Sequence, residues 1–205
     1  MAMRQALSRW ALFLLLTALA SCSGIPLRSL PRLLALHEQL LQASPAELML
    51  AIQVDTRMTP PPGAAPVLQL SIRPAQAGAF EPVDEHLPLR VTTASPDALG
   101  LPMPAADRGW LVYSLAPESQ QELQRLQSHF RRVQAQSAGK GGGTLSVGIS
   151  QEGMAVRNPA LAGTRWETWF QTRRQDGFFE IWSGTVADLL KQAGHSTAAN
   201  APPTN

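Results

Sequence analysis

The sequence predicts an α+β domain: an antiparallel β-sheet or β-sandwich of about seven strands, with an N-terminal helix, one long crossover helix and a short C-terminal helix. Short segments in which apolar and polar residues alternate indicate half-buried strands. Turns and loops rich in proline and glycine separate most of these segments. Only one long helical segment interrupts them, which favours an antiparallel sheet over a doubly wound parallel one.

The first expected element is a helix over 27–42. Its apolar stripe recurs at helical spacing and consists of Leu30, Leu33, Leu34, His37, Leu40 and Leu41. Ser29 suits the N-cap, and Pro31 falls in the first turn, where proline is tolerated. We expect the stripe to pack on the core. The alternative is a helix at a membrane interface, with Arg28 and Arg32 near lipid headgroups.

Four strands are expected next, over 48–55, 67–73, 87–93 and 109–115. The first two alternate aliphatic residues with polar or smaller ones, so one face of each should be buried. The last is apolar on both faces. Because a strand buried on both faces belongs in the middle of a sheet, 109–115 is the predicted centre.

The clearest helix is expected over 118–136, with Pro117 just inside its start. Its apolar stripe is Leu123, Leu126, Phe130 and Val133. A further strand over 145–149 follows it, because Leu145, Val147 and Ile149 alternate with small residues. The helix therefore serves as the crossover between two strands.

A β-hairpin is expected near the C-terminus. Two strand-like segments, 165–175 and 178–183, flank the dipeptide Asp176-Gly177. Asp-Gly between such segments is a strong signal for a two-residue turn. The resulting register places Arg173 opposite Glu180, a favourable pair of opposite charges.

One face of this hairpin would carry Trp169, Phe178 and Trp182, with Arg173 nearby. Aromatic residues together with arginine are typical of the centres of protein–protein interfaces. These four residues are the candidates for binding a partner. The alternative is that a helix, such as the one over 118–136, covers this face.

The chain is expected to end in a short helix and a tail. Thr185 and Asp188 have the spacing of capping partners at the start of that helix. Residues 195–205 are rich in Ala, Thr, Asn and Pro and are predicted to be disordered. A single globular domain over 27–194 is therefore expected.

The first twenty residues have the pattern of an export signal. Arg4 and Arg9 give a positive start without acids, and an apolar run from Trp10 to Ala20 follows, interrupted only by Thr17. The run is shorter than the roughly 20 residues that a membrane-spanning helix needs. It suits the apolar region of a signal peptide.

The tetrapeptide Leu19-Ala20-Ser21-Cys22 resembles the lipobox of bacterial lipoproteins. The resemblance implies that a diacylglyceryl group is attached to the thiol of Cys22 and that the chain is cleaved between Ser21 and Cys22. Residues 1–21 are then the signal peptide and 22–26 a short lipidated tether. Because Ser23 is not Asp, the family's sorting rule implies an anchor in the outer membrane, facing the periplasm.

Charge and cysteine content agree with this interpretation. Cleavage removes Arg4 and Arg9 from the 17 basic residues, so the 15 that remain equal the 15 acidic residues. The mature protein has no basic excess with which to neutralise phosphates, and no nucleic-acid partner is expected. Cys22 is the only cysteine, and lipidation explains why an exported chain carries an unpaired one.

The sequence contains no His-Glu-x-x-His or Gly-x-Ser-x-Gly motif, and no cysteine nucleophile once Cys22 is lipidated. The nearest approach to a metal site is Asp84-Glu85-His86, whose successive side chains point in different directions on an extended chain. No catalytic residue, metal site or cofactor is therefore predicted.

These observations predict a non-enzymatic accessory or scaffold lipoprotein, anchored through Cys22, that binds a periplasmic or envelope protein partner. Two alternatives stay open. One is a carrier that binds lipid or another apolar ligand between sheet and helices. The other is a hydrolase whose residues are too scattered for motif recognition.

Overall fold

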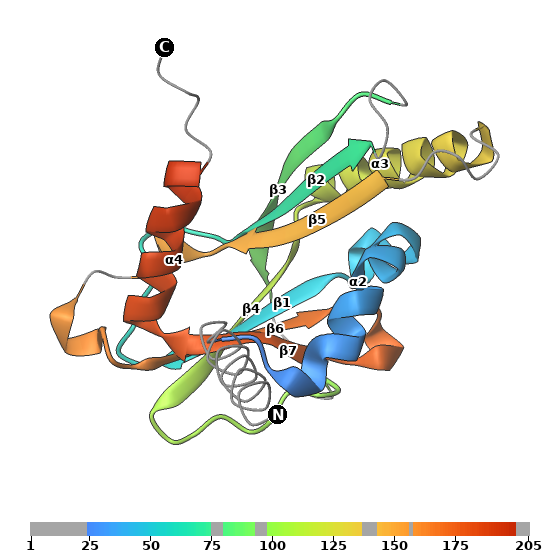
Figure 1. Cartoon of the computed structure of the whole chain (residues 1–205). Helices are drawn as coiled ribbons and strands as arrows, with labels where there is room; N and C mark the ends of the chain where they lie inside the picture. The colour runs from blue at the N-terminus through green and yellow to red at the C-terminus, as the bar shows by residue number, and fades with distance from the viewer. Residues whose placement is uncertain (1–23, 75–79, 93–97, 137–142, 156–157, 200–205) are drawn as a thin grey trace, which may run out of the picture.

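The computed structural model describes residues 24–74, 80–92, 98–136, 143–155 and 158–199. A single seven-stranded sheet curls into a half-barrel (Figure 1). Its strands are β1 Met49–Asp55, β2 Val67–Pro74, β3 Val83–Thr92, β4 Arg108–Leu115, β5 Gly143–Ser150, β6 Arg165–Gln171 and β7 Phe179–Thr185. Their order is β5-β2-β3-β4-β1-β6-β7, and every neighbouring pair is antiparallel. The predicted α+β class is confirmed, as one curled sheet rather than a sandwich.

Among the described residues, three α-helices accompany the sheet: α2 Leu30–Gln42, α3 Pro117–Gln136 and α4 Val186–Ala199. Helix α3 joins β4, in the middle of the sheet, to β5 at its edge, so it is the expected crossover. Helix α4 extends to Ala199 and so includes part of the segment predicted to be a disordered tail; residues 200–205 lie outside the described residues.

The strand predicted as the sheet centre has that position. Strand β4 is fourth of the seven, with β3 on one side and β1 on the other. Strand β1 beside it is buried along nearly its whole length. Strand β2 shows the alternation expected of a half-buried strand, with its leucines and isoleucine inward.

Helix α2 packs on the core through a face that matches the predicted one only in part, at Leu33 and Leu40. Leu33, Leu36, Leu40 and Ala43 contact the core, whereas Leu30 and Leu34 are exposed. The side-chain amide of Gln127 on α3 donates to the carbonyl oxygens of Leu40 (2.8 Å) and Ala43 (2.9 Å). These bonds hold the end of α2 against α3, so contact between the two helices decides which leucines are buried.

The hairpin is present, but the predicted two-residue turn and its register are wrong. The strands pair Phe170 with Phe179, so the connection spans 172–178. It contains a 3-10 turn, Arg174–Asp176. Glu47 anchors this longer loop, because its carboxylate accepts from the backbone N–H of Arg174 and its backbone carbonyl accepts from the side chain of Gln171. Contacts distant in sequence thus override the local Asp-Gly signal.

Candidate functional site

The apolar side chains of the sheet gather on its concave face. Residues paired across neighbouring strands point to the same side of a sheet. Ile149, Leu68 and Leu87 are such neighbours on β5, β2 and β3, as are Leu111 and Ile52 on β4 and β1. All of them belong to, or pack against, one hydrophobic cluster that also includes Trp166 and Phe170 of β6. A single cluster that joins β2 to β6 must lie inside the curl.

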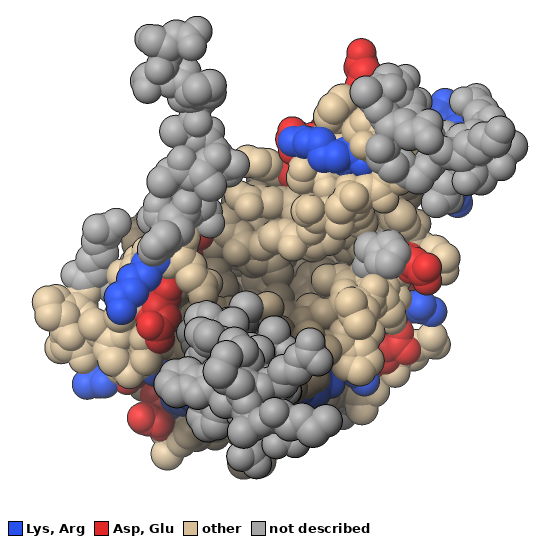
Figure 2. Space-filling view, in the orientation of Figure 1, with Lys and Arg blue, Asp and Glu red and all other residues tan. Residues whose placement is uncertain are grey.

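The described residues do not seal this concave face. Figure 2 shows a hollow at the centre of the molecule, and no Lys, Arg, Asp or Glu of the described residues is visible in it. Several apolar side chains that pack against this cluster are only half-buried: Leu33, Leu36, Leu111, Leu145, Val147, Ile149, Ile181, Trp182 and Leu190. The sheet therefore presents apolar surface in a concavity bounded by the edge strands β5 and β7 (Figure 1).

Strand alternation predicted the inward residues of this face, including Leu145, Val147 and Ile149. It did not reveal that no layer covers them completely. The one local signal is the composition of β5: its eight residues, Gly143–Ser150, include no charged side chain and no proline, although the strand lies at an edge.

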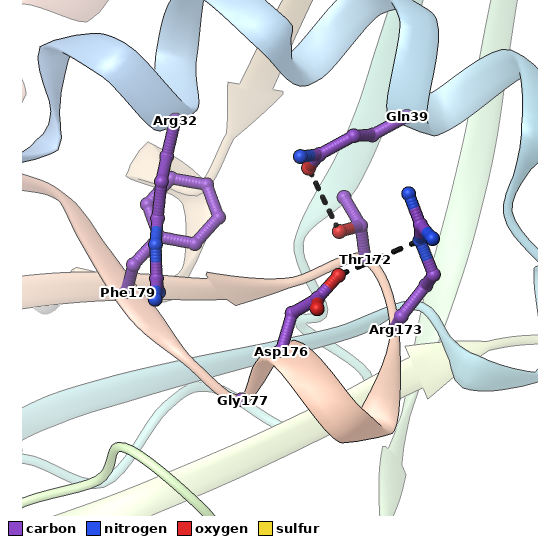
Figure 3. A pocket seen from close by; sticks show the side chains of 7 residues that line it. All are labelled: Arg32, Gln39, Thr172, Arg173, Asp176, Gly177 and Phe179. Carbon is purple, nitrogen blue, oxygen red and sulfur yellow. Dashed lines mark hydrogen bonds and ion pairs between the residues drawn. The ribbon is translucent and has the colours of Figure 1, made fainter.

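A second, polar pocket of about 260 Å³ lies between α2 and the loop that joins β6 to β7 (Figure 3). Its lining is Arg32, Gln39, Thr172, Arg173, Asp176, Gly177 and Phe179. The hydroxyl of Thr172 donates to Gln39 Oε1 at 3.1 Å, and Nε of Arg173 lies 3.5 Å from Asp176 Oδ2. The Arg32 guanidinium lies over the Phe179 ring, 5.5 Å from its centroid.

These contacts connect the helix to the hairpin. The only hydroxyl in the lining is bonded to an amide oxygen and not to a general base, so the pocket contains no activated nucleophile. Its two arginines contact an aromatic ring and a carboxylate of the same pocket. We interpret this pocket as a structural contact between α2 and the loop that joins β6 to β7.

Two of the three hairpin aromatics lie together on the convex face. Trp169 and Phe178 belong to a second apolar cluster around Ala51 and Val112. The ring of Trp169 meets that of Trp110 edge to face, with centroids 6.0 Å apart. The backbone N–H of Phe178 donates to the carbonyl of Leu99 at 2.7 Å. The loop before β4, and not a helix, therefore covers this side of the hairpin, and Phe178 is buried.

Trp182 lies on the opposite face. A register shift between Thr168 and Trp169 places Trp182 opposite Thr168, whose side chain points to the concave side. The three aromatic residues proposed as one surface are consequently divided between two faces. Arg173 lies beside Asp176 in the loop and not opposite Glu180.

Glu180, the predicted partner of Arg173, is buried and paired with a different arginine. The guanidinium of Arg28, which precedes α2, donates to its carboxylate. Arg28 also lies 5.9 Å from the centroid of the Trp169 ring. The N-terminal segment is thereby fixed to the last strand of the sheet.

Another charged cluster joins the middle strands. Arg108 on β4 donates to the Glu167 carboxylate on β6 at 3.0 Å and to the backbone carbonyl of Gln53 on β1 at 2.9 Å. Burial would raise the pKa of Glu167, but hydrogen bonds from Arg108 and Arg165 outweigh it and hold that pKa below its ordinary value. This carboxylate therefore stays ionised and paired, which suits a structural role better than proton transfer.

The acidic segment Asp84-Glu85-His86 belongs to β3, which begins at Val83 and not at residue 87 as predicted. Both oxygens of Asp84 accept from Arg73 on β2, at 2.8 and 2.9 Å, and this pairing lowers the pKa of Asp84. Among the described residues, no three His, Cys, Asp or Glu side chains are placed to hold a metal ion.

The signal and anchor residues, including Ser21 and Cys22, lie outside the described residues. From residue 24 onward, no helix that the structure describes is both long enough and apolar enough to cross a bilayer. Comparison with known proteins gives no match: no family model, no curated protein and no solved structure is similar to this chain.

Proposed function

We propose that the protein is a membrane-anchored envelope lipoprotein that carries lipid or another apolar ligand in the concave face of its curled sheet. The observation that carries the proposal is the hollow of Figure 2, in which no charged side chain of the described residues is visible. Half-buried aliphatic side chains pack against the apolar cluster of the same face of the sheet. The lipobox-like residues Leu19–Cys22 support the anchor and a position at the outer membrane, facing the periplasm.

Apolar surface in a concavity favours a ligand for a simple reason. Removing such surface from water contributes about 25 cal/mol for each Å² buried. Ligand sites are typically concave and mainly apolar. The half-buried apolar side chains that pack against the core cluster come from strands at both ends of the sheet, β5 and β7, and from α2 and α4. An elongated apolar molecule lying between the two edges would contact all of them.

Paired substitutions on one strand test the carrier proposal. Val147 and Ser146 are neighbours on β5 that point to opposite faces, Val147 inward and Ser146 outward. Val147→Glu should place a charge beside the ligand, whereas Ser146→Glu should leave the hollow unchanged. Val147→Trp would fill the space without adding charge.

We expect lipidated wild-type protein and Ser146→Glu to retain non-covalent lipid in native mass spectrometry and to bind a fluorescent apolar probe such as N-phenyl-1-naphthylamine. Both Val147 variants should lose at least tenfold in probe affinity, provided that circular dichroism shows an unchanged fold. Equal probe binding by all four proteins, or none by the wild type, would contradict the proposal.

The second candidate is the scaffold that binds a protein partner. The burial of Phe178 and the separation of Trp182 from Trp169 weaken the aromatic hairpin as its contact surface. The uncharged edge of β5 is the feature that favours it, because an exposed strand edge can accept a strand from a partner. Crosslinking from β5 in intact membranes, followed by identification of the adduct, tests it. Among the described residues, no contact supports the third candidate, a hydrolase.

A further inference from the structure

More than half of the strongly exposed large apolar side chains of the described residues lie in one short segment, although the most exposed of them, Met103, lies elsewhere. Ile25, Leu27, Leu30 and Leu34 have exposed fractions of 48, 81, 42 and 75%. They make up four of the seven large hydrophobic side chains that are strongly exposed in the described part of the chain. A folded domain gains nothing from this exposure unless something else covers the segment.

The exposed side chains form a row. Leu27, Leu30 and Leu34 are spaced by three and four residues, which places them along one side of a helical segment. Leu33 and Leu36, on the flank of the helix next to this row, pack on the core. The helix thus has one apolar flank on the domain and a neighbouring row of leucines that is exposed.

Several contacts hold this segment in one orientation. Arg28 pairs with Glu180, and Arg32 stacks on Phe179. The backbone N–H of Ser183 on β7 donates to the carbonyl of Gly24 at 2.7 Å. Both arginines thus contact the hairpin. The side chains in the outward-facing row are leucines.

We infer that the segment 24–34, through Ile25, Leu27, Leu30 and Leu34, lies in the surface of the lipid bilayer. This inference rests on the proposed lipid anchor, because Cys22 precedes Ile25 by only three residues. Three extended residues span at most about 11 Å, so acyl chains on Cys22 would enter the bilayer close to the leucine row. The segment contains two arginines and no acid, so negatively charged headgroups would not repel it.

A single fluorescent label tests the contact. The sulfur of a lipidated Cys22 cannot react with maleimide, and the chain has no other cysteine, so an introduced cysteine would be labelled alone. Leu34→Cys reports on the row, and Gln124→Cys, exposed on α3, is the matched control. Each lipidated full-length protein would carry the fluorophore NBD and be reconstituted into phosphatidylethanolamine–phosphatidylglycerol vesicles.

We expect the label at position 34 to shift its emission to shorter wavelength and to be quenched by lipids with a nitroxide near the headgroup, and the label at position 124 to show neither effect. In the variant L27E/L30E, the label at Leu34→Cys should be quenched no more than the control, although the protein still floats with the vesicles. Equal signals at 34 and 124 in vesicle-bound protein would overturn the bilayer contact while leaving the anchor intact.

Two other outcomes would also count against the inference. A change at position 34 that needs added envelope proteins would identify a protein as the occupant and overturn the bilayer contact. Failure of the protein to float with vesicles would overturn the lipid anchor itself, and the inferred contact with it.

Discussion

Arg28 and Glu180 are separated by 152 positions in the chain and form an ion pair in which the carboxylate is buried and the arginine is largely exposed. The pair joins the segment before α2 to the edge strand β7. Removing the arginine would leave a buried carboxylate without its partner, which costs more than losing an exposed pair.

We therefore expect Arg28→Gln to lower the free energy of unfolding by about 1–2 kcal/mol, a value reduced because Arg28 is exposed. Urea denaturation measures it. The control is Arg125→Gln, which removes an exposed pair with Glu122 on α3 and should change stability by less than about 0.5 kcal/mol. Equal effects of the two substitutions would show that the Arg28–Glu180 pair contributes no more to the free energy of unfolding than the exposed Arg125–Glu122 pair does.

The cap of α4 provides a second prediction. The backbone N–H of Asp188 donates to the Thr185 hydroxyl, and the backbone N–H and hydroxyl of Thr185 donate to the Asp188 carboxylate. Thr185→Ala should lower stability by about 1 kcal/mol, whereas Thr185→Ser, which keeps the hydroxyl, should stay close to wild type. If the alanine and serine variants unfold at the same urea concentration, the cap is not a source of stability.

The turn before β7 depends on glycine for two reasons that can be separated. Gly177 has φ +66°, and a Cβ added there would lie 2.6 Å from the carbonyl oxygen of Leu99. Gly63 has φ +77° but nothing within 4 Å of such a Cβ. Gly63→Ala should cost about 1 kcal/mol through backbone strain alone. Gly177→Ala should cost clearly more in thermal unfolding, and the reverse order would contradict the close approach.

Asp55 gives a prediction about pH. Hydrogen bonds from the side chain and backbone of Arg57 lower the pKa of Asp55 from 3.8 to about 2. Because the folded value lies below the unfolded one, the stabilisation is complete above pH 3.8 and is lost as the pH falls toward 2. In a carboxyl NMR titration, Arg57→Gln should raise the pKa of Asp55 toward 3.8, and Arg125→Gln should leave it unchanged. A wild-type Asp55 that titrates near 3.8 would refute the assignment.

The anchor has its own test. Cys22→Ser should block lipid attachment and cleavage at the lipobox, so the protein should keep its signal peptide and gain mass on a gel. Metabolic labelling with palmitate should mark wild type and not the variant. Normal processing of the serine variant, with unchanged membrane fractionation, would show that Leu19–Cys22 is not a lipobox.

Several strand positions, the centre of the sheet and the cap of α4 could be predicted from the sequence, because each depends on a pattern among neighbouring residues. Alternating side chains located β1, β2 and β5, and the spacing of Thr185 and Asp188 indicated the cap of α4. The apolar faces of 109–115 indicated the sheet centre. Each of these signals depends on a few neighbouring residues and on whether a side chain avoids water.

The errors come from contacts between distant residues. Glu47, more than a hundred positions away, holds the loop after β6 open and shifts the hairpin register. Gln127 fixes the end of α2, and Leu30 and Leu34 are left exposed. The hollow could not be predicted either, because it depends on how far α2 and α4 cover a sheet whose curvature no short segment specifies.

The position of β1 has a consequence for how the chain folds. This strand is made first, yet its two neighbours are β4 and β6, and Met49 pairs with Gln171. One edge of β1 therefore has no partner strand until the last third of the chain has been synthesised and has reached the folding domain. Such long-range pairing slows folding, and an unpaired apolar strand invites aggregation in the meantime. Chains truncated before β6 should therefore be recovered as aggregates or degradation products rather than as smaller folded domains.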